Sequence, residues 1–162
     1  MRKLLFLLVL LMSFSSFSQD EKIFVADVEN KIQIGKLAGD RNLAFGVKNI
    51  IEEIISDEYY LVDNPEIADY SIEVDMVFLD VETSNVSIAI LHQDKQSVVM
   101  SMVGRLKKGK KIVKKATATE KSSEVSMSTL VISEAGGFNQ TSLSNALKKA
   151  SVSLITKLLD GK

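Results

Sequence analysis

The hydrophobic positions along the chain follow two different periods. In one segment Ile72, Val74 and Met76 alternate with polar residues, which is the pattern of a strand with one buried face. After Asp40, a typical helix N-cap, apolar residues recur every three or four positions, and this spacing predicts a helix that ends near Ser56–Asp57. Its apolar stripe consists of Leu43, Val47, Ile50, Ile51, Ile54 and Ile55.

Strand-like segments lie on both sides of this helix. The alternation that starts near Tyr70 slips by one residue between Val77 and Leu79, which indicates a β-bulge or a strong bend. A second helix is predicted after a cap at Thr141 or Ser142. The predicted strands cover residues 22–28, 59–62, 70–82, 86–91, 97–106 and 111–119, with shorter strand signals at 32–34 and 125–132. The apolar positions of the second helix are Leu143, Ala146, Leu147, Ala150, Leu154, Ile155 and Leu158.

The longer elements follow the order β-α-β-β-β-β-α. Helices at both ends of a run of strands predict an α+β fold, with a mainly antiparallel sheet and the helices packed on one face. The two helices are expected to pack on this sheet; in the alternative, part of a helix is left for a partner, and the small residues Ala150 and Ser151 would let a second helix approach closely. The residues predicted to form the core are Ile50, Ile54, Ile72, Val74, Met76 and Leu147.

The first residues have the three-part plan of a secretory signal peptide. Met1 to Lys3 are cationic, an apolar run extends from Leu4 to Met12, and small Ser16 and Ser18 stand where a signal peptidase reads. Nine apolar residues span only about half of a ~30 Å hydrocarbon core, so a membrane anchor is disfavoured. Residues 1–18 are therefore predicted to be a signal peptide, and residues 19–162 a single α+β domain of the cell envelope, periplasmic or extracellular.

Composition excludes several classes of function. The chain has no cysteine, which excludes disulfides, thiol catalysis, zinc–thiolate sites and the acylated cysteine of a lipid anchor. Without Arg2 and Lys3, eighteen basic residues stand against twenty-one acidic ones, a net charge of −3. Such a chain has no overall field that would draw it to nucleic acid.

The most basic segment, RLKKGKKIVKK at residues 105–115, is interpreted as a hairpin turn. Gly109 lies in a short polar gap between two strand-forming runs, which is a hairpin signal. Neighbouring strand residues point to opposite faces, so Lys114 and Lys115 do not share one patch. No aromatic residue lies within the segment to stack a base. A solvated turn is therefore favoured over an anion site.

The polar residues that could carry chemistry do not form a recognisable constellation. His92, the only histidine, is predicted to lie in a polar connection, and a small hydrolase would need it beside a serine or carboxylate partner. Gly136-Gly137 lacks a phosphate-loop pattern, and Met100 and Met102 are expected in the core. The carboxylates Glu73, Asp75, Asp80 and Glu82 lack calcium-loop spacing and are predicted to lie on the wet, solvent-exposed face of a strand. We assign no catalytic, cofactor-binding or metal-binding residue and expect no enzyme.

Two segments resemble a known envelope family. ADYSIEV at residues 68–74 and VGRLKKGKKIV at residues 103–113 are similar to segments of the curli secretion channel lipoprotein family, whose general fold the penicillin-binding-protein activator lipoproteins share. The helix followed by YLVD at residues 60–63 and the carboxy-terminal helix also fit. The resemblance implies an α+β envelope protein. The chain departs from this family because it has no cysteine to acylate.

These observations predict a non-enzymatic exported protein that acts in protein–protein contacts during cell-envelope assembly or secretion, with an envelope protein or a second copy as partner. The alternative that the resemblance implies is a ring-forming outer-membrane secretion channel subunit. Such a subunit needs membrane strands of about nine to eleven residues. Val125 to Ile132 could supply one, but Ser133 to Gln140 does not read as its return partner, and Val86 to Leu91 is too short. Membrane insertion is therefore not expected.

Overall fold

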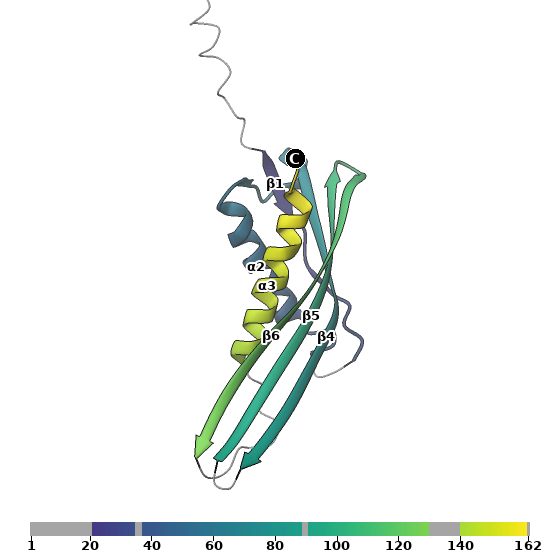
Figure 1. The fold of residues 1–162 in the computed structure, drawn as a ribbon. Coiled ribbons are helices and arrows are strands. Elements are labelled where there is room, and N and C mark those ends of the chain that lie inside the picture. Colours follow the sequence, from purple (N-terminus) through teal and green to yellow (C-terminus); the bar gives the residue numbers. More distant parts are fainter. Residues whose placement is uncertain (1–20, 35–36, 89–90, 130–139, 162) are drawn as a thin grey trace, which may run out of the picture.

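A computed structural model describes residues 21–34, 37–88, 91–129 and 140–161 (Figure 1). Within these ranges, residues 83–88, 91–96, 124–129 and 140 are described by their backbone alone. The predicted signal peptide and Gly136-Gly137 lie outside these ranges. The elements are β1 (Lys22–Val25), β2 (Glu29–Asn30), α2 (Arg41–Ser56), β3 (Tyr60–Leu61), the short 3-10 helix η1 (Pro65–Ile67), β4 (Tyr70–Ile88), β5 (Leu91–Lys108), β6 (Lys111–Thr129) and α3 (Gln140–Leu159).

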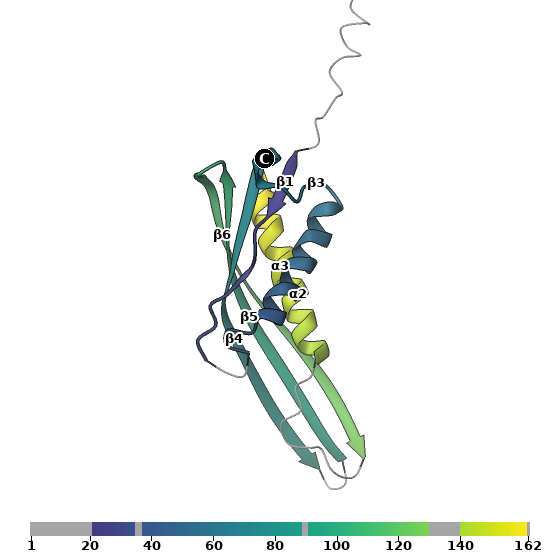
Figure 2. The same cartoon turned by 180° about the vertical axis from the view of Figure 1, so that it is seen from behind.

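The described strands form one sheet with the order β3-β1-β4-β5-β6, and β2 also pairs with β4. The long strands β4, β5 and β6 are antiparallel, whereas β1 is parallel to both β3 and β4. Both helices pack on the same face of this sheet (Figures 1 and 2). The predicted α+β fold, with a mainly antiparallel sheet and helices on one face, is confirmed.

Helix α2 begins where the sequence predicts. The Asp40 carboxylate accepts hydrogen bonds from the backbone N–H groups of Asn42 (2.8 Å) and Leu43 (3.3 Å), which satisfies two donors that a helix leaves free at its start. The most deeply buried stripe of α2 is Ala44, Val47, Ile51 and Ile55. Of the predicted core residues, Ile72, Val74, Met76 and Leu147 are buried, whereas Ile50 and Ile54 are only partly buried. Val47, Ile51 and Ile55 of the predicted stripe thus face the sheet, whereas Ile50 and Ile54 lie at its margin.

The strands are longer than the sequence predicts. Apart from the shift between Met76 and Phe78, which confirms the predicted bulge, β4 and β5 stay paired from Ser71↔Lys107 to Ile88↔Leu91. The prediction of a separate strand at 86–91, with polar connections around it, is therefore wrong. Alternation reports which side chains are buried, whereas the ladder is made by backbone groups that polar residues also possess. β6 likewise runs to Thr129, and the rest of the strand signal at 125–132 lies outside the described residues.

The amino-terminal strand is shorter than predicted. β1 ends at Val25, and the chain rejoins the sheet as β2 at Glu29–Asn30 instead of 32–34. The backbone N–H of Lys31 donates to the Met76 carbonyl oxygen at 2.9 Å, and Ile34 beyond it is exposed. Both short strands therefore pair with β4, the central strand of the sheet, in the parallel direction.

The β5–β6 hairpin is confirmed. Lys108 pairs with Lys111, and Gly109 between them has a φ of 57°, a left-handed conformation that glycine adopts without steric cost. Lys114 lies on the helix-covered face, where its Nζ donates to the Asp160 carbonyl oxygen at 2.6 Å. Lys115, the next residue, points to the opposite face, as predicted.

Gly104 sets the distance between β5 and α3. A Cβ atom at this position would lie 2.7 Å from Leu158 Cδ1 and 3.1 Å from both Leu154 methyl carbons. Both leucines are fully buried. A side chain at residue 104 would therefore push α3 away from the sheet.

Gly104→Val is expected to lower the free energy of unfolding by roughly 1–3 kcal/mol, the usual cost of overpacking a core. Urea denaturation would measure it. Gly46→Ala is the control, because a Cβ there meets nothing within 4 Å and the helix gains about 0.5–1 kcal/mol. An unchanged urea midpoint for Gly104→Val would contradict this account of the β5–α3 contact.

Candidate interaction site

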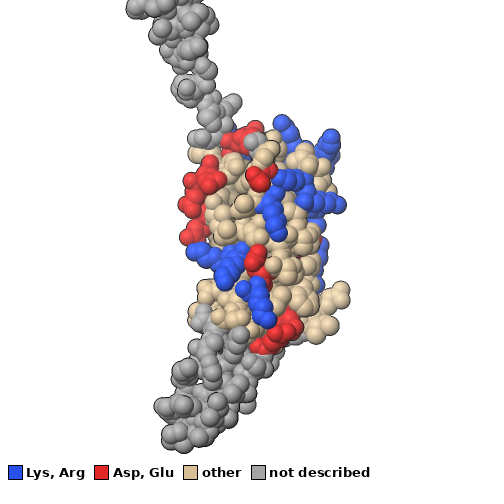
Figure 3. Space-filling model, in the orientation of Figure 1, with Lys and Arg blue, Asp and Glu red and all other residues tan. Residues whose placement is uncertain are grey.

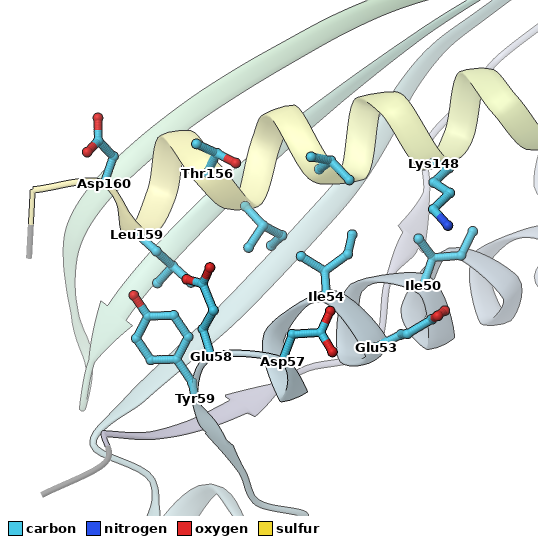
Figure 4. Close-up of a pocket in the computed structure, with 12 residues that line it drawn as sticks. Ile50, Glu53, Ile54, Asp57, Glu58, Tyr59, Lys148, Thr156, Leu159 and Asp160 are labelled. Atoms are coloured by element: carbon cyan, nitrogen blue, oxygen red, sulfur yellow. The ribbon is translucent and has the colours of Figure 1, made fainter.

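A groove of about 510 Å³ lies between the second halves of α2 and α3 (Figure 4). We call it the helix groove. Its walls come from α2, the turn that follows α2, and the last three turns of α3. The lining residues are Ile50, Glu53, Ile54, Asp57, Glu58, Tyr59, Lys148, Val152, Ile155, Thr156, Leu159 and Asp160.

The floor of the helix groove is apolar. Ile50 and Ile54 project from α2 toward α3 and are only partly buried. Ile155 and Leu159 of α3 are buried, while Val152 is 43% exposed. All of these residues recur at three- or four-residue spacing, so each helix presents one continuous ridge to the other. Packing between the helices leaves part of both ridges uncovered.

The rim of the helix groove is acidic. Glu53, Asp57 and Glu58 come from the end of α2 and its following turn, and Asp160 follows α3. Among the described side chains, none of these four carboxylates forms an ion pair. The pKa of Tyr59 is raised by burial, and further by the charges of Glu58 and Glu21. Lys148 is the one cation among the lining residues, so the rim has a net negative charge.

The position of these acids on the helix is electrostatically unfavourable. A helix carries a partial negative charge at its C-terminus, where cations are stabilising by about 0.3–1 kcal/mol each. The last turn of α2 has no basic residue, and Asp57 itself is the C-cap. A cationic group that bound at the rim would relieve this repulsion.

A second hollow, of about 520 Å³, lies between β2 and the start of α2, and both of its carboxylates are paired. Lys48 Nζ lies 2.8 Å from Asp27 Oδ1, and Lys31 Nζ lies 2.9 Å from Glu29 Oε2. This hollow therefore lacks the unpaired carboxylates of the helix groove. Phe45, which is 66% exposed, lies beside it.

The sheet face opposite the helices carries an ion-pair network. Arg105 donates to both Asp75 carboxylate oxygens (2.8 and 3.1 Å) and to Glu73 Oε2 (3.1 Å). Lys107 Nζ donates to Glu73 Oε1 at 2.6 Å, and Lys31 Nζ lies 3.0 Å from Asp75 Oδ2. Every charge of the network has a partner, so it has the character of a structural cluster.

This network corrects one prediction. Asp75, predicted to be on a wet strand face, is only 5% exposed, because the Arg105 and Lys31 side chains cover it. Asp80 and Glu82 are exposed as predicted. Burial alone would raise the pKa of Asp75, but hydrogen bonds from Arg105 and Lys31 outweigh it, and the net pKa is lowered. Among the described residues, no group of three potential ligands could hold a metal ion.

The other candidate residues are dispersed. His92 lies within strand β5, opposite Ser87 and Ser128, and not in the predicted connection. Its side chain is outside the described part. Met100 and Met102 are fully buried, as predicted. Ala150 and Ser151 are also fully buried, which confirms that this part of α3 packs on its own core.

Neither helix of the described residues is long and apolar enough to cross a membrane.

The helix groove was not predicted as a site from the sequence. Two signals for it were present, the acidic end of α2 and the width of its apolar stripe, which covers both the 50/54 and the 51/55 positions.

Neither a family model nor a curated protein matches the sequence. The structure is similar to a neuraminyllactose-binding hemagglutinin homolog from Helicobacter pylori (TM-score 0.50, 10% identity, covering 88% of this chain and 87% of that one). Weaker similarities link it to the PelC dodecamer from Paraburkholderia phytofirmans (TM-score 0.48, 12% identity, 88% and 91% covered) and to a lipoprotein from Neisseria meningitidis (0.41, 13%, 84% and 98%). At these identities the likeness is one of fold, and the curli-type resemblance stays a prediction.

Proposed function

We propose that this chain is an exported, non-enzymatic protein of the cell envelope that works through protein–protein contacts, with the helix groove as its contact surface. The observation that carries the proposal is the combination of a partly uncovered apolar floor with four unpaired carboxylates at the rim. This is the anatomy of a protein interface, an apolar centre within a polar margin.

A protein segment fits the helix groove better than a small molecule does. Small-molecule sites place a few polar groups inside an enclosing pocket, where they fix the orientation of the ligand. Here the carboxylates stand at the margin, on α2, in the turn after it and beyond the end of α3, and Lys148 is on α3 (Figure 4). Val152, the exposed apolar residue of the lining, offers an anchor position on a helix.

The export part of the proposal is supported by the first eighteen residues. A cationic start, an apolar run of nine residues and small residues at Ser16 and Ser18 are the features that a secretory pathway recognises. The sequence has no cysteine, so contact with the envelope would come from protein partners and not from an acylated cysteine.

Val152→Glu tests the contact. A tagged full-length chain is expressed in its exporting cell, the envelope is extracted in mild detergent, and the size of the tagged species is measured by gel filtration. The wild-type chain is expected in a species larger than the monomer, and Val152→Glu is expected to elute as the monomer. A carboxylate at this lining position adds repulsion from the acidic rim and loses the apolar contact.

Phe45→Glu is the matched control, since it puts the same charge on an even more accessible apolar residue outside the helix groove. It is expected to leave the large species intact. Circular dichroism checks that both variants are folded. A large species that survives Val152→Glu, or that only Phe45→Glu disrupts, would overturn the proposal.

A further inference from the structure

The turn of the β5–β6 hairpin carries positive charge and exposed apolar side chains, which complement the acidic rim and apolar floor of the helix groove. We call residues 107–115 the hairpin tip. Ile112 and Val113 are 39% and 46% exposed, although both are large apolar residues. The exposed lysines of the tip are Lys108, Lys110, Lys111 and Lys115. The hairpin tip is therefore a basic surface with an apolar centre.

Three of the six tip lysines are already engaged within the chain. Lys107 is bound to Glu73, Lys114 to the Asp160 carbonyl, and Lys108 lies over the Tyr70 ring at 5.4 Å. Among the described side chains, Lys110 and Lys111 form no ion pair. Unpaired lysines and unpaired carboxylates thus occur on two separate surfaces of one chain.

These two surfaces lie at the same end of the molecule and meet at Asp160, whose carbonyl oxygen accepts from Lys114, but the turn of the tip and the α2 wall of the groove lie on opposite sides of α3. In Figure 1 the β5–β6 hairpin ends on one side of α3 and α2 lies on the other. Figure 3 shows acidic side chains gathered along the α2 side and lysines along the opposite upper side. A tip therefore does not occupy its own groove, and two copies placed side by side bring a tip to a groove.

We infer that the occupant of the helix groove is the hairpin tip of a second copy of this chain. The inference rests on the proposed function of the groove and names its partner. Ile112 and Val113 would cover the exposed floor at Val152, while Lys110 and Lys111 would face the acidic rim. The contact is complementary both in charge and in apolar area.

Such a contact is heterologous, because it joins two different surfaces. A bound pair keeps one free tip and one free groove, so further copies add until the assembly closes into a ring or continues as a filament. The rim charges are exposed, and interactions between exposed charges are screened beyond about 10 Å at 0.1 M salt. Self-association is therefore expected to weaken as salt is added.

A charge exchange tests the inference on purified residues 19–162. The tip variant is Lys110→Glu with Lys111→Glu, the groove variant is Glu53→Lys with Asp57→Lys, and the combined variant carries all four substitutions. Sedimentation velocity at low salt measures the dissociation constant of self-association. The tip and groove variants are each expected to weaken it by about tenfold or more, since each places like charges opposite one another. The combined variant, in which both signs are exchanged, is expected to recover self-association.

Three results would overturn the inference. The first is a wild-type chain that stays monomeric at the highest concentration reached. The second is a folded combined variant that fails to recover. The third is an envelope extract in which the groove variant elutes as the monomer while the tip variant still elutes in the large species. In the third case the helix groove binds another basic protein, so the proposed function stands while the second-copy inference fails.

Discussion

Val74→Asp is expected to leave the chain unfolded under conditions in which the wild-type protein is folded. Val74 is 1% exposed, lies in the first half of β4 and pairs with Gly104 of β5 beneath α3. A carboxylate there would be buried among apolar side chains. An uncompensated buried charge costs roughly 3–5 kcal/mol, a large fraction of the about 5–15 kcal/mol that stabilises a typical domain. Far-ultraviolet circular dichroism and the spread of methyl signals in a proton NMR spectrum would measure the loss.

Val77→Asp is the control for this prediction. It makes the same chemical change in the same strand, but Val77 is the extra residue of the bulge and is exposed. It is expected to melt cooperatively, close to the wild-type temperature. If Val74→Asp also melted cooperatively near that temperature, the assignment of β4 to the centre of the core would be wrong.

Arg105→Met is expected to have the next largest effect. Arg105 makes three hydrogen bonds to Glu73 and Asp75, and its loss leaves the buried Asp75 with Lys31 as its remaining cation. Breaking a buried ion pair from one side costs roughly 3–5 kcal/mol, and we expect the lower end of that range because Lys31 remains. Urea denaturation near neutral pH measures this change. Lys121→Met, which removes an exposed ion pair with Glu82 at 3.3 Å, is expected to cost only about 0–1 kcal/mol.

The effect of Arg105→Met is expected to depend on pH. The pKa of Glu73 is lowered by hydrogen bonds from Lys107 and Arg105, despite an opposing effect of burial, and the pKa of Asp75 is also lowered. A carboxyl with a lowered folded-state pKa stabilises the fold fully above its ordinary value and loses this stabilisation as the pH falls through the folded-state value. Their ordinary values are 4.5 and 3.8.

The difference between wild type and Arg105→Met should therefore shrink on acidification from about pH 7 to about pH 3. Protonation removes the charge that the lost guanidinium had compensated. Urea midpoints of both proteins across this range measure it. A difference that stayed constant with pH would show that Arg105 stabilises the fold through packing alone and not through these carboxylates.

Local signals in the sequence were sufficient for several elements. The Asp40 cap and the apolar spacing after it located α2, and Gly109 between two β-branched runs located the hairpin. The slip in alternation located the bulge at Val77. Each of these features is determined by residues within a few positions of one another, so one window of sequence contains the whole signal.

Asp75 shows what such a window leaves out. Alternation placed it correctly on the face opposite the helices, and that face was expected to be wet. Its burial depends on Arg105, which is 30 residues away in sequence, and on Lys31 beyond β2. The register of β4 on β5 and the path of the amino-terminal segment decide this environment, and neither is encoded near Asp75.

The helix groove also depends on long-range geometry. The sequence predicted Ile50 and Ile54 as core residues, and they do contact the core, but the angle between α2 and α3 leaves them partly uncovered. Helix packing angles follow from side chains on both helices, here about a hundred positions apart. The acidic end of α2 and the width of its apolar stripe gave the local signs that this surface differs from an ordinary helix face.

The central claim is that the helix groove is a protein contact, and photo-crosslinking in the exporting cell tests it most directly. A photoreactive amino acid replaces Val152 in one variant and Phe45 in another, and adducts are detected by the mass of the tagged chain after irradiation. The account predicts a discrete protein adduct from Val152 and none from Phe45. An adduct from Phe45 alone, or no adduct from Val152 in a folded and exported chain, would contradict it.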